Sequence, residues 1–191
     1  MIITGCLISA FLLLAAAYAI FRILFRRDYR QKGQLTPLSA LLGTLVWFCW
    51  GGFPAIYASR DWPATHVDPI LGIPGKIFLW SGLAIMLFGI VQLGLLRAFG
   101  RRQTILKQIG FYRFSRNPQI IGCALYGIGF AALWPSWCAL IWIALFAPVA
   151  HLMVLTEEEH LRKKHGETYV RYCERTPRYL PYKRIRVSLL K

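Results

Sequence analysis

Long uncharged stretches alternate with short charged ones along the chain. Ile2 to Phe21 contains no charged side chain, and about 20 apolar residues are enough for a helix to span the hydrocarbon core of a bilayer. The alternation predicts five spans, at Ile2–Phe25, Pro37–Ala58, Gly75–Phe99, Pro118–Trp134 and Trp137–Leu155. We therefore expect an all-α fold, a polytopic membrane helix bundle that forms one domain over residues 1–191, with three N-terminal spans in residues 1–99.

The last two spans and the polar tail form a second part of the predicted bundle. Only the Pro135-Ser136 turn separates the two spans, so they should fold back on each other as an antiparallel hairpin. In the tail, a spacing of three to four residues predicts an amphipathic helix from about Glu157 to Arg175, with one face formed by Leu161, His165, Tyr169 and Tyr172. We expect the functional site in the hairpin and tail, residues 111–182.

The distribution of charge predicts how the helices are oriented. The formal net charge is +15, which in a soluble protein would suggest nucleic-acid binding. Here the basic residues cluster between spans, so the positive-inside rule explains them, and we expect a lipid bilayer and no nucleic acid as the partner. The N-terminus should lie outside, with residues 26–36, residues 100–117 and the tail in the cytoplasm. The compact chain suggests a bacterial inner membrane, and Met1 to Gly5 lacks the basic residues of a cleaved signal peptide, so we expect the first span to be retained.

The cysteines and histidines do not form a recognisable metal site. None of the five cysteines belongs to a Cys-x-x-Cys pair, and we expect them to be small apolar residues of the bundle. Glu157 and His160 form a Glu-x-x-His pair, which can be half of a di-metal site, but the chain has no second such pair. We therefore expect no metal. His151 lies within the fifth span, where it is either a functional group or a hydrogen-bonding partner of a neighbouring helix.

The segment FYRFSRNPQIIG, residues 111–122, brings polar chemistry to the start of the fourth span. Asn117 is a favourable N-cap residue and Pro118 suits the first helical position. The free N–H groups of such a helix start attract anions, and Arg113 and Arg116 add positive charge. These residues also fit a simpler alternative, an ordinary capped membrane helix with arginines on its cytoplasmic side.

Acidic residues follow the other end of the hairpin, where Glu157, Glu158 and Glu159 succeed the fifth span. Because the turn makes the two helices antiparallel, the start of the fourth span and these glutamates should lie at a similar depth. Arginines and helix N–H groups would then face carboxylates across a gap that suits a zwitterion, with a carboxylate at one side and an ammonium or sulfonium at the other. Small residues in the fourth span should permit close helix packing, namely Gly122, Gly127, Gly129 and Ala131.

Two motifs in this region resemble one family. GFYRFSRNPQIIG resembles the G-P-[FY]-R-x-[ST]-R-[HN]-P-x-Y-x-G signature of the isoprenylcysteine carboxyl methyltransferase and phospholipid methyltransferase superfamily. EEEHLRKKHGETYVRYCERTPRYLP resembles its second signature, E-E-x-x-L-x-x-x-[FY]-G-x-x-Y-x-x-Y-x-x-x-[VT]-P-R-x-x-P. The chain departs from the pattern at Asn117, where histidine is commoner, at Ile120 and Ile121, where a tyrosine often follows the proline, and at His165, where the family has an aromatic residue. Met153 stands where carboxyl-methylating members have an arginine, which weakens the case for a prenylcysteine carboxylate as acceptor.

The resemblance implies an integral membrane methyltransferase that uses S-adenosylmethionine. The acceptor would be a lipid or lipid-linked carboxylate or amine at the cytoplasmic face, and the cofactor site would lie in residues 111–182. Catalytic roles are implied for Glu157 and Arg116. If the acceptor is a carboxylate, an arginine would attract it and Glu157 would bind the cofactor's ammonium; if it is an amine, Glu157 would act as base. Cofactor-binding residues implied by the resemblance are Arg116, Asn117, Pro118, Gly122, Glu157, Glu158, Tyr169, Tyr172 and Arg178.

Two other classes of protein remain open. Membrane sterol and enone reductases have a similar architecture and tail and use NADPH, but an acidic pair would repel the phosphate of that cofactor. The chain could also be a membrane scaffold without enzymatic activity, in which case each motif would only mark the end of a helix. The spacing of Gly166, Tyr169 and Tyr172 before Pro177-Arg178 argues against a scaffold through the family resemblance alone.

Overall fold

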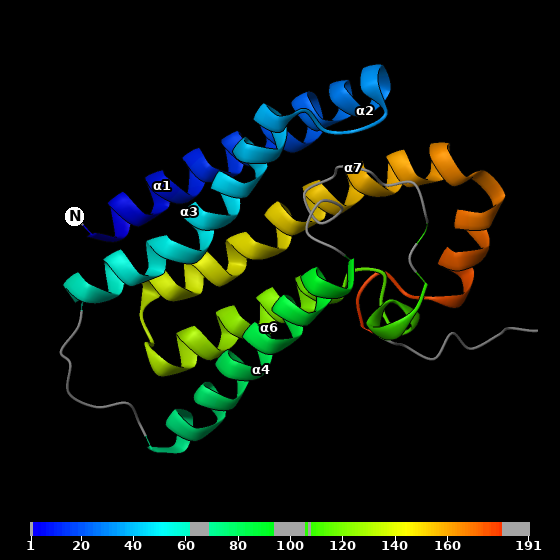
Figure 1. Cartoon of the computed structure of the whole chain (residues 1–191). Helices are drawn as coiled ribbons and strands as arrows, with labels where there is room; N and C mark the ends of the chain where they lie inside the picture. Colours follow the sequence, from blue (N-terminus) through cyan, green and yellow to red (C-terminus); the bar gives the residue numbers. More distant parts are fainter. Residues whose placement is uncertain (1, 62–68, 94–105, 107, 181–191) are drawn as a thin grey trace, which may run out of the picture.

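The computed structural model describes residues 2–61, 69–93, 106 and 108–180, and within these residues it contains helices and no strand (Figure 1). This confirms the predicted all-α class. The order of elements is α1 (Ile2–Tyr18), the π-helical segment η1 (Ala19–Phe25), α2 (Arg26–Lys32), α3 (Pro37–Asp61), α4 (Pro69–Leu93), the 3₁₀ turn η2 (Gly110–Arg113), α6 (Pro118–Leu133) and α7 (Trp137–Arg175).

Three helical stretches are long and apolar enough to cross a membrane: Ile3–Lys32, Ile70–Gln92 and Trp137–Arg175. Two further apolar stretches are shorter, the part of α3 over Pro37–Gly52 and α6 over Pro118–Leu133. The predicted membrane helix bundle is therefore confirmed, although the helix boundaries differ from those expected. The third span begins at Pro69 instead of Gly75, because α4 accommodates Pro74 within the helix, as membrane helices often do. The predicted end of that span, residues 94–99, lies outside the described residues.

The first span does not end at Phe25 but continues through η1 into α2 as one rod. Gly33 ends the rod in the left-handed conformation, with φ 65°, as is usual after a helix. The buried carboxylate of Asp28 then fixes the turn that follows: Thr36 donates its backbone N–H to Oδ2 of Asp28 at 3.0 Å, and Ser39 donates its hydroxyl at 2.5 Å. These bonds satisfy the start of α3 and hold α2 firmly beside it.

The core lies where α7 packs against the first rod and α3. Its largest members are Phe21, Phe25, Trp50 and Trp142. The indole N–H of Trp50 donates to the carbonyl of Trp142 at 3.0 Å, which joins α3 to α7 inside the apolar region. In a membrane, helix association depends on close packing and on bonds of this kind more than on the hydrophobic effect.

Glycines bring α4 and α6 into backbone contact, as the small residues of the fourth span predicted. A Cβ added at Gly129 would collide with the backbone nitrogen of Leu79 and lie 2.7 Å from the carbonyl oxygen of Gly75. A Cβ added at Gly122 would meet the backbone of Met86 and of Gly82 in the same way. Any side chain at these positions would push the two helices apart.

Gly129→Ala is therefore expected to lower the free energy of unfolding by about 1–3 kcal/mol, the usual cost of overpacking. Gly52→Ala is the matched control, because it is also a glycine inside a helix but has nothing within 4 Å of the added Cβ. The control should be neutral or slightly stabilising, since alanine favours helices over glycine. Thermal unfolding in detergent measures both, and equal stability of the two variants would contradict the close contact.

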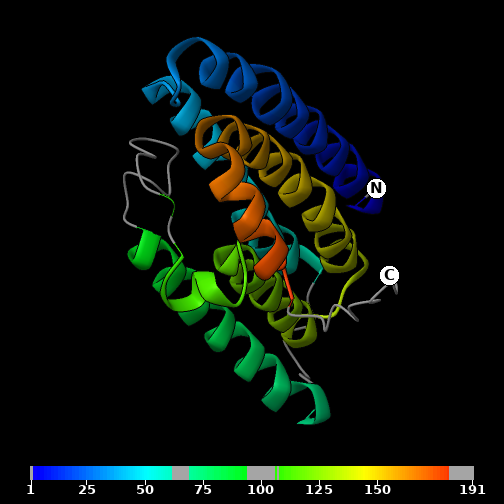
Figure 2. The same cartoon turned by 90° about the vertical axis from the view of Figure 1, so that its right-hand side faces the viewer.

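The polar segments gather at one end of the bundle. In Figure 1 the N-terminus lies at the left, whereas α2, η2 and the bent end of α7 lie at the right, and Figure 2 views this end face-on. The predicted fifth span and tail helix are merged into α7, which bends at Gly166, where φ is 50° and ψ is −128°. Such angles are open to glycine and strained for other residues. The bend turns the last helical turns of α7 back toward the start of α6 (Figure 2).

Candidate functional site

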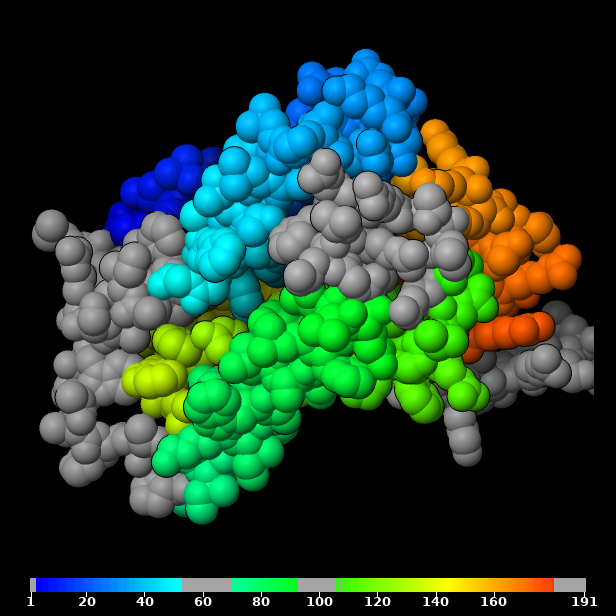
Figure 3. Space-filling view, in the orientation of Figure 1, coloured from blue at the N-terminus to red at the C-terminus, as the bar shows by residue number. Residues whose placement is uncertain are grey.

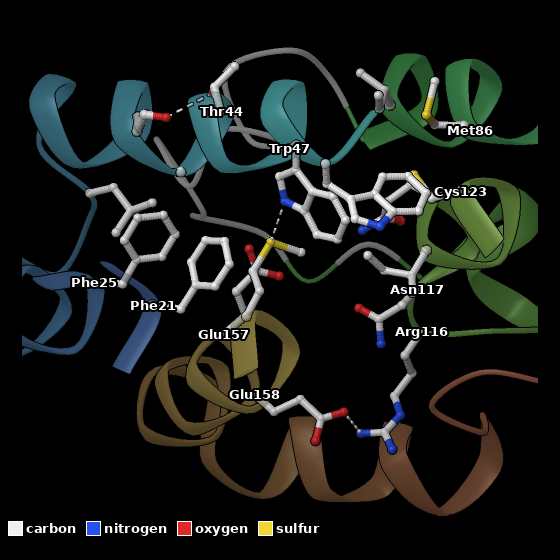
Figure 4. Close-up of a pocket in the computed structure, with 18 of the residues that line it drawn as sticks. Phe21, Phe25, Thr44, Trp47, Met86, Arg116, Asn117, Cys123, Glu157 and Glu158 are labelled. Atoms are coloured by element: carbon white, nitrogen blue, oxygen red, sulfur yellow. Dashed lines mark hydrogen bonds and ion pairs between the residues drawn. The ribbon is translucent and has the colours of Figure 1, made fainter. Parts of the chain in front are cut away.

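A cavity of about 730 Å³ lies between the helices, with walls from η1, α3, α4, α6 and α7. Its volume is typical of small-molecule sites, which span roughly 300–1,000 Å³. On the face shown in Figure 3, both α3 and α4 lie at the surface. Most of the cavity wall is apolar, and its charged residues gather at the end where α6 begins: Arg116, Glu157 and Glu158 (Figure 4).

Glu158 is bound by two arginines. Its Oε1 atom lies 2.8 Å from Nη1 of Arg116, and Arg178 donates from Nε at 3.0 Å and from Nη2 at 2.6 Å. The side chains of Arg116 and Glu158 are only 12% and 13% exposed, so solvent screens this pair weakly. The hydrogen bonds to Glu158 raise the pKa of Arg178 above its usual value, which keeps its charge fixed. The gap that the sequence predicted between basic and acidic groups is therefore closed at Glu158.

Glu157 differs from its neighbour. Within the described residues its carboxylate has no hydrogen bond and no ion pair, although it lines the same cavity. In Figure 4 the carboxylate of Glu157 and the amide of Asn117 point into the cavity from different walls. Burial disfavours the charged form of such a carboxyl group, and a cation bound beside it would stabilise that form.

Arg116 retains unused hydrogen-bonding capacity. Besides its contact with Glu158, its Nη1 atom donates to the sulfur of Cys173 at 2.7 Å. Its Nε atom is buried and has no hydrogen-bond partner within the described part of the chain. A buried donor without a partner costs free energy, so a ligand acceptor at Nε would be favourable. Glu157 and Arg116 thus offer one acceptor and one donor of opposite charge to the same space.

The start of α6 holds the C-terminal segment in place. The amide of Asn117 donates to the carbonyl of Arg178 at 3.1 Å, and the backbone N–H of Arg116 donates to the carbonyl of Pro177 at 2.9 Å. The expectation that the Asn117 side chain caps α6 is therefore wrong: Asn117 occupies the N-cap position but makes no side-chain cap hydrogen bond. Its amide binds the tail, and its own N–H donates to the hydroxyl of Ser115 at 3.1 Å.

Tyrosines close the same end of the cavity. Tyr169 and Tyr172, both buried, reach it from the part of α7 beyond the bend. Tyr172 donates its hydroxyl to the carbonyl of Tyr112 at 2.7 Å, and Tyr112 donates to Oε1 of Gln119 at 3.0 Å. Burial, followed by the nearby charge of Glu157, raises the pKa of Tyr112, so this hydroxyl stays protonated and donates. The chain of bonds ties α7 to η2 and α6.

The predicted site residues separate into two groups. Six line the cavity, namely Arg116, Asn117, Glu157, Glu158, Tyr169 and Tyr172. Three do not: Pro118 is buried at the first position of α6, Gly122 is packed against α4, and Arg178 reaches the site through Glu158. The similar depth expected for the start of α6 and the glutamates of α7 is confirmed, because Asn117 and Glu157 share one cavity.

Sequence reasoning missed several contributors. Ser115 lies within the first motif and binds both Asn117 and, at 3.3 Å, the carbonyl of Arg178, so its position beside Arg116 could have identified it. Tyr112 also lies within the first motif, at its [FY] position, whereas Cys173 carries no signal in the sequence that distinguishes it from a structural residue. His151 is exposed on α7 and lines neither of the two cavities described here.

A comparison with known protein families matches part of the chain. The model of the phospholipid methyltransferase family matches residues 75–168, which include most of α4, all of η2 and α6, and α7 from its start to just beyond Gly166. This confirms the family resemblance over that segment. No curated protein and no solved structure matches the chain.

Proposed function

We propose that this chain, which matches the phospholipid methyltransferase family over residues 75–168, is a membrane methyltransferase that moves a methyl group from S-adenosylmethionine to the amine of a lipid. The family implies methyltransferase activity on lipid substrates in a membrane. The choice of cofactor, the amine acceptor and a site at the cytoplasmic face are our inference. The observation that carries the proposal is the unpaired carboxylate of Glu157 beside the ion-paired Arg116 in one cavity.

The cavity residues fit the cofactor's chemistry. The cofactor carries a carboxylate, an ammonium and a sulfonium on one small molecule. The unpartnered Nε of Arg116 is a donor for a carboxylate, and Tyr126, Tyr169 and Tyr172 offer aromatic surface for an adenine ring. The tail, held by Asn117 and Glu158, excludes water from this end, which strengthens electrostatic interactions inside.

The apolar part of the cavity fits a lipid chain. It extends away from the charged end between the first rod, α3 and α4, where Phe25, Phe48 and Met86 are among the lining residues. A lipid with its headgroup near Glu157 would place its chain along this wall. A small water-soluble acceptor would leave most of this apolar surface without a contact.

The charges favour an amine over a carboxylate as acceptor. Arg116 is the one lysine or arginine among the described residues that line the cavity, and Glu158 already neutralises it. A carboxylate acceptor would meet the unpaired Glu157 without a free cation to offset the repulsion. At the position where carboxyl-methylating relatives have an arginine, Met153 accepts a hydrogen bond from the indole of Trp47 at 3.3 Å.

In this mechanism the protein aligns the reactants and removes a proton. S-adenosylmethionine, when bound, supplies an electrophilic methyl group. A lipid amine is protonated in water and must lose its proton before it can act as a nucleophile, and Glu157 accepts that proton. Arg116 would orient the cofactor through Nε, while Glu158, itself bound by Arg178, holds the guanidinium of Arg116 in place. Alignment of this kind can supply several kcal/mol of rate enhancement, about 7–11 in the best cases.

Purified protein in nanodiscs is expected to transfer label from S-adenosylmethionine to phosphatidylethanolamine, detected by mass spectrometry of the lipid. Phosphatidylcholine, whose nitrogen is fully substituted, and a prenylcysteine carboxylate serve as acceptor controls and should gain no methyl group. Methylation of the carboxylate alone would contradict the amine acceptor. Binding of NADPH in place of S-adenosylmethionine would contradict the proposed class of enzyme.

Glu157→Gln is expected to lower turnover about 10²–10⁴-fold, the range for loss of a general base, while S-adenosylmethionine affinity changes less than about tenfold. Isothermal titration for affinity and single-turnover kinetics separate the two effects. Glu174→Gln is the matched control, because Glu174 is exposed on the same helix and lines neither cavity described here. Unchanged turnover in Glu157→Gln would remove this residue from the mechanism.

A further inference from the structure

A second, polar cavity of about 350 Å³ lies outside the proposed methyl-transfer site, between α2 and the part of α7 that follows Leu155. Its lining residues include members of α2 and α7, and Figure 2 shows α2 and the bend of α7 at the same end of the bundle. Nothing in the proposed methyl transfer uses it. Its walls combine four basic side chains with a single acid.

The positive charge of this cavity is only partly neutralised. Glu159, the acid, is already bound by Arg22 at 2.9 Å and by Arg26 at 2.8 Å. Within the described residues, the remaining basic members of the wall form no ion pair: Arg30, Lys163 and Lys164. Three like charges that converge on one hollow without a counter-ion repel one another, and an anion would relieve that repulsion.

A buried histidine adds a polar group of fixed direction. His160 is 7% exposed and lines the cavity, and its ring stacks on Tyr29 with 4.0 Å between centroids. The stacking fixes the ring, and its Nε2 atom has no hydrogen-bond partner within the described residues. A fixed imidazole without a partner, beside unneutralised lysines, provides the mixture of directed hydrogen bond and diffuse positive charge that a phosphate group takes.

The position of the cavity indicates where such a phosphate would come from. Ile23, one turn before Arg26, is 61% exposed and apolar, so this part of the first rod faces lipid. Beyond Leu155, α7 changes from apolar to charged residues, which is the level of the headgroups. Basic groups at this level attract anionic lipids.

We propose that the cavity formed by Arg30, His160, Lys163 and Lys164 binds a phosphate group, supplied by the headgroup of an anionic phospholipid. This site is separate from the methyl-transfer cavity. The bound phosphate holds the charged part of α7 against α2, and thereby helps to fix the position of the residues of α7 that follow Lys164. The inference does not depend on the proposed enzymatic activity, because it concerns different residues and a ligand that is not consumed.

The test is a native mass spectrometry titration of the full chain in detergent with phosphatidylglycerol and with phosphatidylcholine of the same acyl chains, without S-adenosylmethionine. One phosphatidylglycerol is expected to bind with at least a tenfold preference over phosphatidylcholine. The variant Arg30→Gln/Lys163→Gln/Lys164→Gln should reduce that preference to less than twofold. All three residues are exposed, so the variant should still fold.

The matched control removes the same charge elsewhere on α7, as Arg162→Gln/Arg171→Gln/Arg175→Gln, and should retain the preference, since these exposed residues do not line the cavity. An equal loss of lipid preference in both triple variants would show that the preference comes from the general positive charge of the surface, and would overturn the proposal. Equal binding of the two lipids by the unmodified chain would also overturn it. Inorganic phosphate in a second titration distinguishes the source: displacement of the lipid by millimolar phosphate would support the phosphate site and assign it to a free anion.

Discussion

Glu158→Gln is expected to weaken binding of S-adenosylmethionine by about 100-fold and to release the C-terminal segment from the bundle. The substitution leaves the guanidinium groups of Arg116 and Arg178 without their shared carboxylate. Removing one partner of a buried pair typically costs about 3–5 kcal/mol, because the other charge stays buried and unpaired. Arg178 is 34% exposed, so solvent screens its share and most of the cost falls on Arg116.

Cofactor binding should weaken because Glu158 holds both Arg116 and the C-terminal segment in place. Arg116 faces the cavity, and the backbone carbonyl of Arg178 accepts hydrogen bonds from Ser115 and Asn117. Loss of the ion pairs between Glu158 and the two arginines therefore disturbs both the position of the Nε donor of Arg116 and the closure of the cavity by the C-terminal segment. A free-energy change of roughly 2.7 kcal/mol corresponds to about 100-fold in affinity.

The adjacent Glu159 provides the matched control. It also binds two arginines, Arg22 and Arg26, but lies outside the methyl-transfer cavity. Glu159→Gln should lower thermal stability and leave the affinity for S-adenosylmethionine within about threefold of the unmodified chain. Isothermal titration and the rate of tryptic cleavage at Arg178 measure the two effects. Equal cofactor affinities for both variants would contradict the assignment of Glu158 to the site.

Much of the fold was predictable because hydropathy is a strong local signal. Apolar runs of span length predicted the long helices, and the two-residue Pro135-Ser136 turn predicted the hairpin of α6 and α7. The boundaries were less predictable, because they depend on tertiary packing. Pro74 lies inside α4, and the apolar and amphipathic halves of α7 are continuous, since no residue between Leu155 and Gly166 breaks the helix.

The residues of the site could be predicted, but which glutamate binds which arginine could not. Motif spacing brought Arg116, Asn117 and Glu157 together, and the structure places them around one cavity. Which of the three consecutive glutamates meets which arginine depends on the rotation of α7, which side-chain types alone do not determine. Glu157 lines the cavity without an ion pair, Glu158 binds two arginines from α6 and the tail, and Glu159 binds two from the first rod. Glu159, which was not among the predicted site residues, therefore links α7 to the first rod.

Gly166 is the position where a single methyl group is expected to misplace the tail without damaging the membrane core. Its φ of 50° and ψ of −128° lie in a region that residues with a Cβ rarely adopt, at a cost of about 1–3 kcal/mol. Nothing lies within 4 Å of the Cβ that would be added, so backbone strain and not crowding is the cause. In Gly166→Ala the chain can relieve the strain by straightening α7, which would carry Tyr169 and Tyr172 away from the cavity.

Gly166→Ala is therefore expected to lower S-adenosylmethionine affinity more than tenfold and to speed tryptic cleavage after Arg171 and Arg175, while thermal unfolding of the bundle changes little. The core formed by Phe21, Trp50 and Trp142 does not involve the residues beyond the bend, which is why the two effects should separate. Glu167→Ala is the matched control, because it adds no strain at the next, exposed position and should leave affinity and cleavage unchanged. If Gly166→Ala binds the cofactor normally and its tail resists trypsin, the bend is not required to close the site, and the roles proposed for Tyr169 and Tyr172 lose their structural basis.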